Sequence, residues 1–330
     1  MNVLITGGAG FIGSNLAHAL ASAGETVRVL DDFSTGRAEN LAGLAGHVEV
    51  IKGDVRDQDQ VRAAVAGVEV VYHLAALPSV ARSVADPRAS HGVNVDGTLN
   101  VLLAAKDAGV RRLVYASSSS VYGDTAVLPK HEEMPVSPRS PYAAAKLAGE
   151  AYCRALARVY PIETVSLRFF NVFGPRQDPA SQYAAVVPRF VTRMLAGLPA
   201  EITGDGAQTR DFTYVANAVE ACRLAAAAGA QANGEAMNVG CNHRISVLDL
   251  AGIVNELLGE RIEPAFVAAR PGDVRDSQAS IAKAARLIGY KPLVTVREGL
   301  AATVRWLAAE RRHGGNGSSP RDPLLTRPRE

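Results

Sequence analysis

A tyrosine and a lysine four positions apart are the residues with the clearest chemistry in this sequence. Tyr142 and Lys146 lie in Ser-Pro-Tyr-Ala-Ala-Ala-Lys, where Ser140 suits a helix N-cap and Pro141 suits the first helical turn. Side chains four residues apart share one face of a helix. A tyrosine with an ordinary pKa of about 10 is a poor base at neutral pH, and a nearby ammonium favours its phenolate. The pair therefore predicts proton transfer to or from a hydroxyl group.

A run of serines offers a hydroxyl partner for this pair. Residues 117–120 are all serine, and they end a strand predicted over residues 112–117. Polar groups at the carboxyl end of a central strand lie where open α/β sheets bind their ligands. A serine opposite Tyr142 would hold a substrate hydroxyl while the proton passes to the tyrosine. We therefore expect the reacting atoms at this strand end.

Three glycines near the N-terminus predict a second part of the site. Gly7, Gly10 and Gly13 follow a short apolar strand over residues 3–5, and helical spacing of apolar residues begins at Phe11. Glycine lets phosphate oxygens approach main-chain N–H groups closely, and a helix N-terminus adds unpaired donors and a partial positive charge. A strand, a glycine turn and a helix start in this order predict the pyrophosphate site of a dinucleotide.

An acidic pair predicts which dinucleotide is bound. Asp31 and Asp32 end a strand predicted over residues 26–30, close to where a dinucleotide fold places an acid on the adenosine ribose. A carboxylate accepts hydrogen bonds from the ribose hydroxyls and repels a 2′-phosphate, which favours NAD over NADP. Arg37 lies nearby and can hold a phosphate, so this preference stays open at this point.

Alternating strands and helices predict the fold class. Strands and helices of this length indicate an α/β protein with a doubly wound parallel sheet. Gly53-Asp54-Val55 and Leu74-Ala75-Ala76 end two of the strands, where an adenine edge and a closely approaching cofactor would be accommodated. His73 lies within an apolar strand and is interpreted as a hydrogen-bonded structural histidine. Besides those above and the helix that begins after Ser140, the predicted elements include strands 47–52 and 69–73 and helices 11–23, 58–66, 93–109 and 281–288.

Composition limits the partners and the compartment. The chain has 330 residues, 48% of them hydrophobic and 21% charged, a composition typical of a globular protein. Its length exceeds that of a domain with a single hydrophobic core. A net charge of +2 gives no reason to expect nucleic acid or an anionic membrane as a partner. The three cysteines lack metal-ligand spacing, and no apolar run approaches the roughly 20 residues that span a bilayer. Because the first strand starts at once, we expect no signal peptide and a cytoplasmic location.

Taken together, these motifs resemble the extended short-chain dehydrogenase/reductase superfamily, and within it the nucleotide-sugar epimerases. The glycine triplet, Asp31-Asp32, Ser-Ser-Ser-Val-Tyr-Gly-Asp and Tyr-x-x-x-Lys carry the resemblance, which extends from residue 1 to about residue 310. It implies a Rossmann domain, NAD as cofactor and a UDP-sugar as substrate. The NAD contacts that it implies come from Gly7, Gly10, Phe11, Ile12, Gly13, Asp31, Asp32, Ser34, Asp54, Val55, Leu74, Ala75, Ala76, Asn94, Ser117, Tyr142 and Lys146.

The resemblance also implies a catalytic serine. Counting four residues back from Tyr122, as the family pattern suggests, identifies Ser118, with Ser119 or Ser120 able to share its role. Related dehydratases and decarboxylases carry an acid after the catalytic Ser/Thr, and this chain has serine there. The absent acid favours simple epimerisation over elimination or decarboxylation.

Three later segments resemble parts of the family that hold the sugar diphosphate. Arg-Phe-Phe-Asn-Val-Phe-Gly-Pro contains Asn171, Thr-Arg-Asp-Phe-Thr-Tyr-Val contains Arg210, and Ala-Arg-Pro-Gly-Asp-Val contains Arg270 and Asp273. Two guanidiniums suit a diphosphate because each donates two parallel hydrogen bonds. For Arg210 a salt bridge to the neighbouring Asp211 is the alternative interpretation, and for Arg270 a solvated loop charge.

One aligned position suggests the sugar. In the 4-epimerases that the chain resembles, a small residue three positions after Gly-Asp-Val admits a 2-acetamido group, and this residue is Ser277. The resemblance therefore favours UDP-GlcNAc and UDP-GalNAc, with UDP-Glc and UDP-Gal also possible substrates. Ser79 and Ser83 are further candidate sugar contacts, or ordinary loop residues. Epimerisation at another carbon, decarboxylation of UDP-glucuronate and a non-catalytic NAD-binding regulator remain alternatives.

The chain is expected to form two lobes that interleave in sequence. The NAD-binding domain is predicted over residues 1–167, with 212–239 returning to it, and the substrate lobe over 168–211 and 240–310. Residues 311–330, rich in Gly, Ser, Pro and Arg, are expected to be a disordered tail. The Ala-rich helices over 93–108 and 145–160 predict a homodimer.

Overall fold

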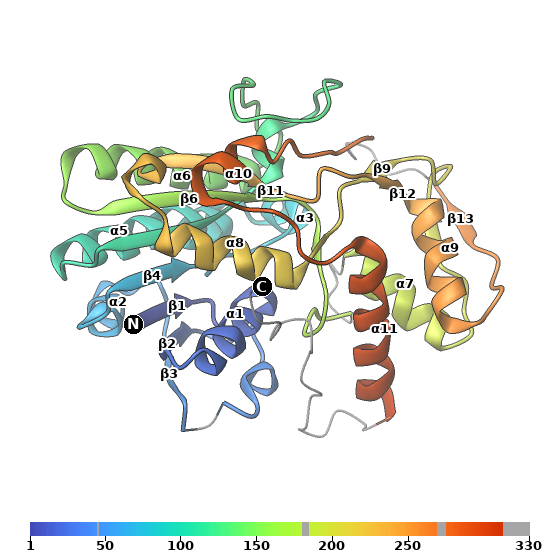
Figure 1. The fold of residues 1–330 in the computed structure, drawn as a ribbon, viewed down its shortest axis with the longest axis horizontal. Coiled ribbons are helices and arrows are strands. Elements are labelled where there is room, and N and C mark those ends of the chain that lie inside the picture. The colour runs from blue at the N-terminus through green and yellow to red at the C-terminus, as the bar shows by residue number, and fades with distance from the viewer. Residues whose placement is uncertain (45, 180–184, 269–274, 313–330) are drawn as a thin grey trace.

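The computed structural model describes residues 1–44, 46–179, 185–268 and 275–312. A parallel sheet is covered by helices on both faces, and a second group of helices and short strands lies beside it (Figure 1). Among the residues described, every helix is too short or too polar to span a bilayer.

The predicted doubly wound parallel sheet is confirmed. Its seven strands are parallel and follow the order β11-β6-β5-β4-β1-β2-β3, so the direction of winding reverses beside β1. Such a reversal opens a crevice at the carboxyl ends of the strands, where α/β proteins bind ligands. The strands are β1 (Asn2–Thr6), β2 (Thr26–Asp31), β3 (Val48–Lys52), β4 (Val70–His73), β5 (Arg112–Ser118), β6 (Glu163–Phe169) and β11 (Glu235–Val239).

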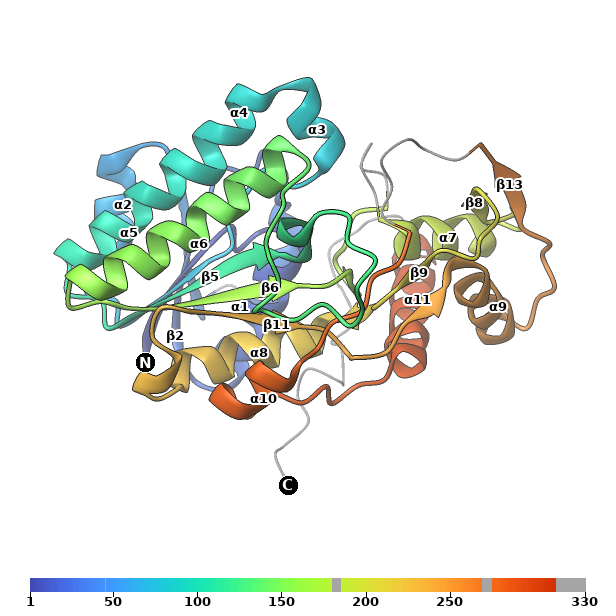
Figure 2. The same cartoon turned by 90° about the horizontal axis from the view of Figure 1, so that it is seen from above.

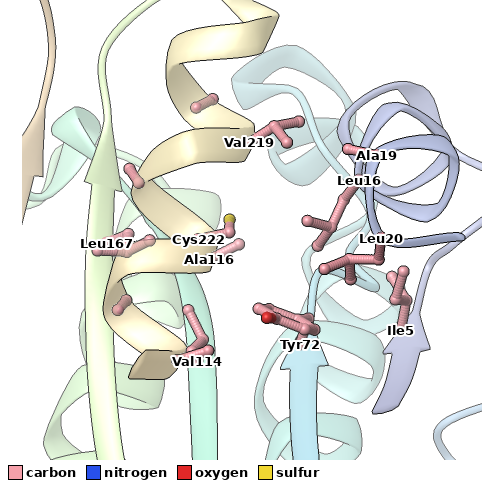
Figure 3. Close-up of a cluster of buried hydrophobic side chains, with 14 of the residues drawn as sticks. Ile5, Leu16, Ala19, Leu20, Tyr72, Val114, Ala116, Leu167, Val219 and Cys222 are labelled. Atoms are coloured by element: carbon pink, nitrogen blue, oxygen red, sulfur yellow. The ribbon is translucent and has the colours of Figure 1, made fainter. Parts of the chain in front are cut away.

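One face of the sheet is covered by α1 (Phe11–Ser22), α8 (Val215–Ala227) and α10 (Ala282–Ile288). Figure 3 shows Leu16 of α1 and Val219 of α8 pointing into the apolar space over the strands. Burial of these side chains fixes α1 against β1, which sets the direction in which its N-terminus points. The glycine turn is thereby held at the crevice.

The position of α10 differs from the prediction. The sequence predicts the helix over residues 281–288 as part of the substrate lobe, but Ala284, Leu287 and Ile288 are buried in the same core as the sheet. Tyr290, just after the helix, donates a hydrogen bond from its hydroxyl to Gly240 O at 3.0 Å, beyond the end of β11. Periodicity shows which face of a helix is buried, and it carries no information on which core buries that face.

The opposite face is covered by α2 (Gln58–Val65), α5 (Gly97–Asp107) and α6 (Pro141–Val159), as Figure 2 shows. A π-helical turn over Gly92–Asp96 leads into α5, so the predicted helix 93–109 is present with a wider first turn. Two short helices, α3 (Val80–Ala85) and α4 (Pro87–His91), precede it.

A second core lies beside the sheet. It is formed by residues such as Phe173, Phe190, Tyr214, Leu250 and Leu300, and its helices stand apart from the sheet in both views (Figures 1 and 2). The division of the chain into an NAD domain and a substrate lobe stays a prediction, and residues 313–330 of the predicted tail lie outside the described residues. The elements here are β7 (Val172–Phe173), α7 (Val186–Leu195), β8 (Glu201–Thr203), β9 (Thr209–Arg210), β10 (Thr213–Tyr214), β12 (Ile245–Ser246), α9 (Val247–Leu258), β13 (Ala265–Val267) and α11 (Val296–Arg312).

Candidate active site

A cavity of about 790 Å³ lies at the carboxyl ends of β1, β2, β4 and β5. It brings together segments that are far apart in the sequence, because parallel strands present their carboxyl ends at one edge of the sheet. Most of the predicted cofactor residues line it, together with Ser79 and Ser118: Gly7, Gly10, Phe11, Ile12, Gly13, Asp31, Asp32, Ser34, Asp54, Val55, Leu74, Ala75, Ala76, Ser117, Tyr142 and Lys146.

The glycine turn forms a backbone cradle in the wall of this cavity. Gly7 has a φ of +71°, and a Cβ there would lie 2.6 Å from the amide nitrogen of Ala75. A Cβ on Gly13 would lie 2.2 Å from the carbonyl oxygen of Gly7, so no other residue fits. α1 begins at Phe11 without a side-chain cap, which leaves its first N–H groups for a ligand. These donors and the helix dipole fit a pyrophosphate.

Asp31 has two tasks at the end of β2. Its carboxylate accepts hydrogen bonds from the amides of Ala9 at 2.8 Å and Phe33 at 2.9 Å, and its side chain lines the cavity. Burial raises the pKa of Asp31, and these hydrogen bonds oppose the rise. The carboxylate therefore fixes the glycine turn as well as facing the place predicted for the ribose. Asp32 accepts from the backbone and hydroxyl of Ser34 and shapes the next turn.

The end of β3 presents a second acid to the cavity. The carboxylate of Asp54 is held by the Arg56 guanidinium, with Nε within 2.9 Å of Oδ2, and this hydrogen bond lowers the pKa of Asp54. The amide of Asp54 donates to Gln60 Oε1 at 2.8 Å. Asp54 thus faces the cavity as a carboxylate with its orientation set by neighbours in the sequence.

Asn94 does not line the cavity, in contrast to the prediction. It is fully buried, its Oδ1 accepts from the Leu77 amide at 2.9 Å, and its Nδ2 donates to Leu77 O at 3.1 Å. Its amide therefore holds the segment after β4 in the cavity wall. His73 is buried between the hydroxyls of Thr6 and Thr98, at 2.7 and 2.9 Å, and burial lowers its pKa to about 3. The prediction of a hydrogen-bonded structural histidine is confirmed.

Tyr142, Lys146 and Ser118 meet in the cavity wall. Pro141 begins α6 and Ser140 caps it by accepting the amide of Ala143, so the predicted helix start is confirmed. Lys146 Nζ lies 5.9 Å from the centre of the Tyr142 ring and donates to Ala116 O at 2.8 Å.

The electrostatics of these groups are set by burial. Burial lowers the pKa of Lys146 to about 8. Burial raises the pKa of Tyr142, and a hydrogen bond from Ser118 opposes the rise. The pKa of Tyr142 is thus shifted in the opposite direction to the prediction, because the tyrosine is desolvated. A phenolate at neutral pH therefore depends on positive charge brought close to its oxygen.

A buried ion pair lies behind the serine run. Ser117 Oγ donates to Glu150 Oε1 at 2.5 Å, and Arg168 donates to both oxygens of Glu150 at 2.9 and 2.7 Å. Arg168 also donates to the Tyr122 hydroxyl at 2.9 Å, which donates to Asn238 Oδ1 at 2.7 Å. This network joins the ends of β5, β6 and β11 with α6.

A second cavity of about 270 Å³ adjoins the first, sharing Val172 and Ala185 in its wall. Asn171 and Arg210 both line it, as a shared substrate site would require. Arg210 Nη1 donates to the carbonyls of Thr209 and Arg275 at 2.8 and 2.9 Å. The carboxylate of Asp211 instead accepts the amides of Cys241 and Ala279, so the alternative of an Arg210–Asp211 salt bridge is wrong.

Three predicted contacts lie away from both cavities. Ser83 is buried and donates to Val80 O at 2.7 Å within α3, and Ser119 begins the turn after β5 without lining the wall. Ser277 is 6% exposed, and its amide donates to Thr209 O, so it lines neither cavity among the described residues. Arg270 and Asp273 lie outside the described residues.

The structure also places residues in the cavity that the sequence analysis missed. Arg176 lines it after β7, and Arg82 lines it from α3. The signal for Arg176 was its position directly after Asn-Val-Phe-Gly-Pro, a motif that was interpreted only up to the proline.

Comparison with known proteins agrees with this geometry. UDP-glucose 4-epimerase of Mycolicibacterium smegmatis is 42% identical over 310 residues, covering 93% of this chain and 98% of the relative. A UDP-N-acetylglucosamine 4-epimerase from Methanobrevibacter ruminantium, solved with UDP-N-acetylmuramic acid, has a TM-score of 0.89 at 37% identity, covering 94% of this chain and 98% of that one. Thermus thermophilus UDP-glucose 4-epimerase in complex with NAD has a TM-score of 0.85 at 37% identity, with coverages of 93% and 99%.

UDP-glucuronic acid decarboxylases are also among the relatives, for example one from Xenopus tropicalis at 35% identity over 321 residues, covering 95% of this chain and 74% of the relative. The model of the NAD dependent epimerase/dehydratase family matches residues 3–240, which include the glycine cradle, Asp31, Tyr142 and Lys146. The cradle, the uncapped start of α1 and the ribose-facing carboxylate fit NAD. This chain therefore belongs to the NAD dependent epimerase/dehydratase family and uses NAD as its cofactor.

Proposed function

We propose that this protein interconverts UDP-hexoses that differ in configuration at C4. The observation that carries the proposal is the placement of Ser118, Tyr142 and Lys146 in one cavity wall with the glycine cradle. A protein that only binds dinucleotide has no need of a tyrosine and serine aligned beside a buried ammonium. The 4-epimerases among the relatives support the same reaction.

The side chains have separate tasks in this proposal. When bound, NAD supplies reversible hydride transfer, which makes the sugar C4 a ketone for part of the cycle. Tyr142 accepts the proton of the C4 hydroxyl and later returns it. Ser118 orients that hydroxyl by hydrogen bonding and stabilises the phenolate. Lys146, fixed on Ala116 O, adds positive charge beside the ring. Net redox is zero, so no external reductant is consumed.

The adjoining cavity supports a site for the UDP diphosphate. Asn171 and Arg210 line it, and Ser79, Arg270 and Asp273 remain sequence-based proposals for substrate contacts. An amide and a guanidinium suit phosphate oxygens. The hexose would be held loosely in the larger cavity, since it must present both faces to the cofactor. That looseness fits a cavity whose lining includes Ser79 and small residues such as Ala75 and Ala76.

We propose UDP-GlcNAc and UDP-GalNAc as the first substrate pair to test, with UDP-Glc and UDP-Gal beside them. The UDP-N-acetylglucosamine 4-epimerase relative supports the first pair and the UDP-glucose 4-epimerases support the second. Ser277, the basis of the sequence prediction, lines neither cavity and adds no support. We also propose a cytoplasmic homodimer. Exposed Leu103 on α5 and Tyr152 on α6 support pairing through these helices.

The test is NMR of the sugar anomeric protons after the purified protein is incubated with UDP-GlcNAc, without added NAD. Appearance of UDP-GalNAc would support the proposal, as would interconversion of UDP-Glc and UDP-Gal in a parallel sample. Conversion of UDP-glucuronate with release of carbon dioxide would instead establish a decarboxylase. The absence of turnover with every UDP-sugar, with NAD supplied, would contradict the proposal and favour a non-catalytic NAD-binding protein.

The buried ammonium of Lys146 predicts a pH dependence of stability. Its pKa is about 8 in the folded protein and 10.5 as the ordinary value, so the unfolded state binds more protons between these pH values. Stability contributed by this group therefore rises with pH from about 8 to 10.5. We expect the free energy of unfolding of the natural protein to increase relative to Lys146→Met over this range, measured in urea at pH 7, 8, 9 and 10. A difference that stays constant with pH would contradict the prediction.

A further inference from the structure

Arg176 lies in the cavity wall although no motif assigned it a task. It follows β7 in the segment Gly174-Pro175-Arg176, is 5% exposed, and lines the same cavity as the glycine cradle. A guanidinium stays charged at any physiological pH. A positive charge is therefore built into the wall of the cavity that Gly10 and Phe11 also line.

The position of Arg176 is fixed by a residue of α1. Asn15 is fully buried, its Oδ1 accepts from Arg176 Nη1 at 2.9 Å, and its Nδ2 donates to Pro175 O at 3.0 Å. Asn15 Nδ2 also lies 2.8 Å from Phe11 O, in the first turn of α1. Asn15 thus links the Arg176 guanidinium to the first turn of α1, because Asn15 lies about one helical turn after Phe11.

The backbone supports the same interpretation. Arg176 has a φ of +67°, a conformation that non-glycine residues rarely adopt and that costs about 1 kcal/mol or more. Asn15 and the burial of the side chain hold it there. Such strain is commonly retained where a side chain must reach a particular place.

We infer that Arg176 is a cofactor-binding residue that holds a diphosphate, namely the pyrophosphate of NAD. The N–H groups at the start of α1 and the helix dipole offer positive potential to the cavity, and the Arg176 guanidinium adds a full positive charge to the lining of the same cavity. Two positive groups facing one cavity favour an anion between them, and a guanidinium matches two phosphate oxygens in a planar fork. Asn15 is the positioning residue for this contact.

The inference concerns cofactor affinity, so it rests on NAD dependence and not on the proposed sugar chemistry. The test is isothermal titration of nucleotide-free protein with NAD, ADP-ribose and UDP. Arg176→Gln is expected to lower the affinities for NAD and for ADP-ribose by the same factor, about 10- to 100-fold, because both ligands carry the pyrophosphate. The affinity for UDP is expected to stay within twofold. The NAD retained by the protein through purification should fall accordingly.

Two further variants make the result specific. Arg62→Gln removes an exposed arginine of α2 and should leave all three affinities unchanged. Arg176→Lys keeps the positive charge but loses the planar fork of hydrogen-bond donors. The affinities for NAD and ADP-ribose should therefore fall about threefold to tenfold, and the affinity for UDP should stay unchanged. This variant decides the matter if Arg176→Gln fails to fold. NAD affinity that is unchanged in the Arg176 variants, or a loss confined to UDP, would overturn the inference, the latter because Arg176 would then serve the substrate diphosphate.

Discussion

Replacing Tyr142 by phenylalanine is expected to lower kcat by about 10²–10⁴-fold while NAD binding is retained. The change removes one hydroxyl from the cavity wall and leaves the ring and the backbone of α6 in place. It removes the proton acceptor that the proposed chemistry needs, and also the partner of Ser118. The ring contributes to the shape of the wall, so the NAD affinity should change by less than about twofold. Steady-state turnover and NAD titration of the same preparation measure both effects.

A second tyrosine on the same helix provides the control for this variant. Tyr152 lies on α6 with 37% of its surface exposed and lines neither cavity. Tyr152→Phe is therefore expected to keep full activity and full NAD affinity. If Tyr142→Phe turned over at the natural rate, another group would have to take the proton, and the assignment of Tyr142 would be wrong.

The parts of the site that the sequence predicts well are those built from contiguous residues. The glycine turn, Asp31 and the start of α6 each depend on a few neighbouring residues and on one strand or helix. Their meeting point follows from the topology alone, because parallel strands with helical crossovers place their carboxyl ends along one edge. Local sequence patterns and the parallel sheet are therefore enough to predict that the glycine turn, Asp31 and the start of α6 lie together in one site.

The parts that the sequence predicts poorly depend on where side chains point over long distances. Asn94 and Ser83 lie in helical segments close to the cavity in sequence. Their side chains form hydrogen bonds with the backbone of Leu77 and Val80 and do not line the cavity. Alignment places Ser277 near the sugar, yet its neighbour in space is the backbone of Thr209. Arg176 reaches the cofactor cavity through a contact 161 positions away in the sequence, with Asn15. Spacing carries no signal for such contacts.

The ion pair between Glu150 and Arg168 is the place where a single substitution should damage stability most. Both side chains are 5% exposed, and Arg168 donates two hydrogen bonds to Glu150. Removing one partner leaves the other charge buried, which costs about 3–5 kcal/mol. We therefore expect Glu150→Gln to lower the free energy of unfolding by this amount, as measured in urea.

The same variant tests whether the network supports the catalytic elements. Ser117 donates to Glu150, and Ser118 follows it at the end of β5, so loss of the carboxylate should also lower kcat in the fraction that remains folded. Arg62→Gln, which breaks the exposed pair with Asp59, should cost less than about 1 kcal/mol and leave kcat unchanged. Similar losses of stability in the two variants would mean that the buried pair is no more important than a surface one. A normal kcat in Glu150→Gln would mean that the network stabilises the fold without contributing to catalysis. The serine run would then be positioned by β5 alone.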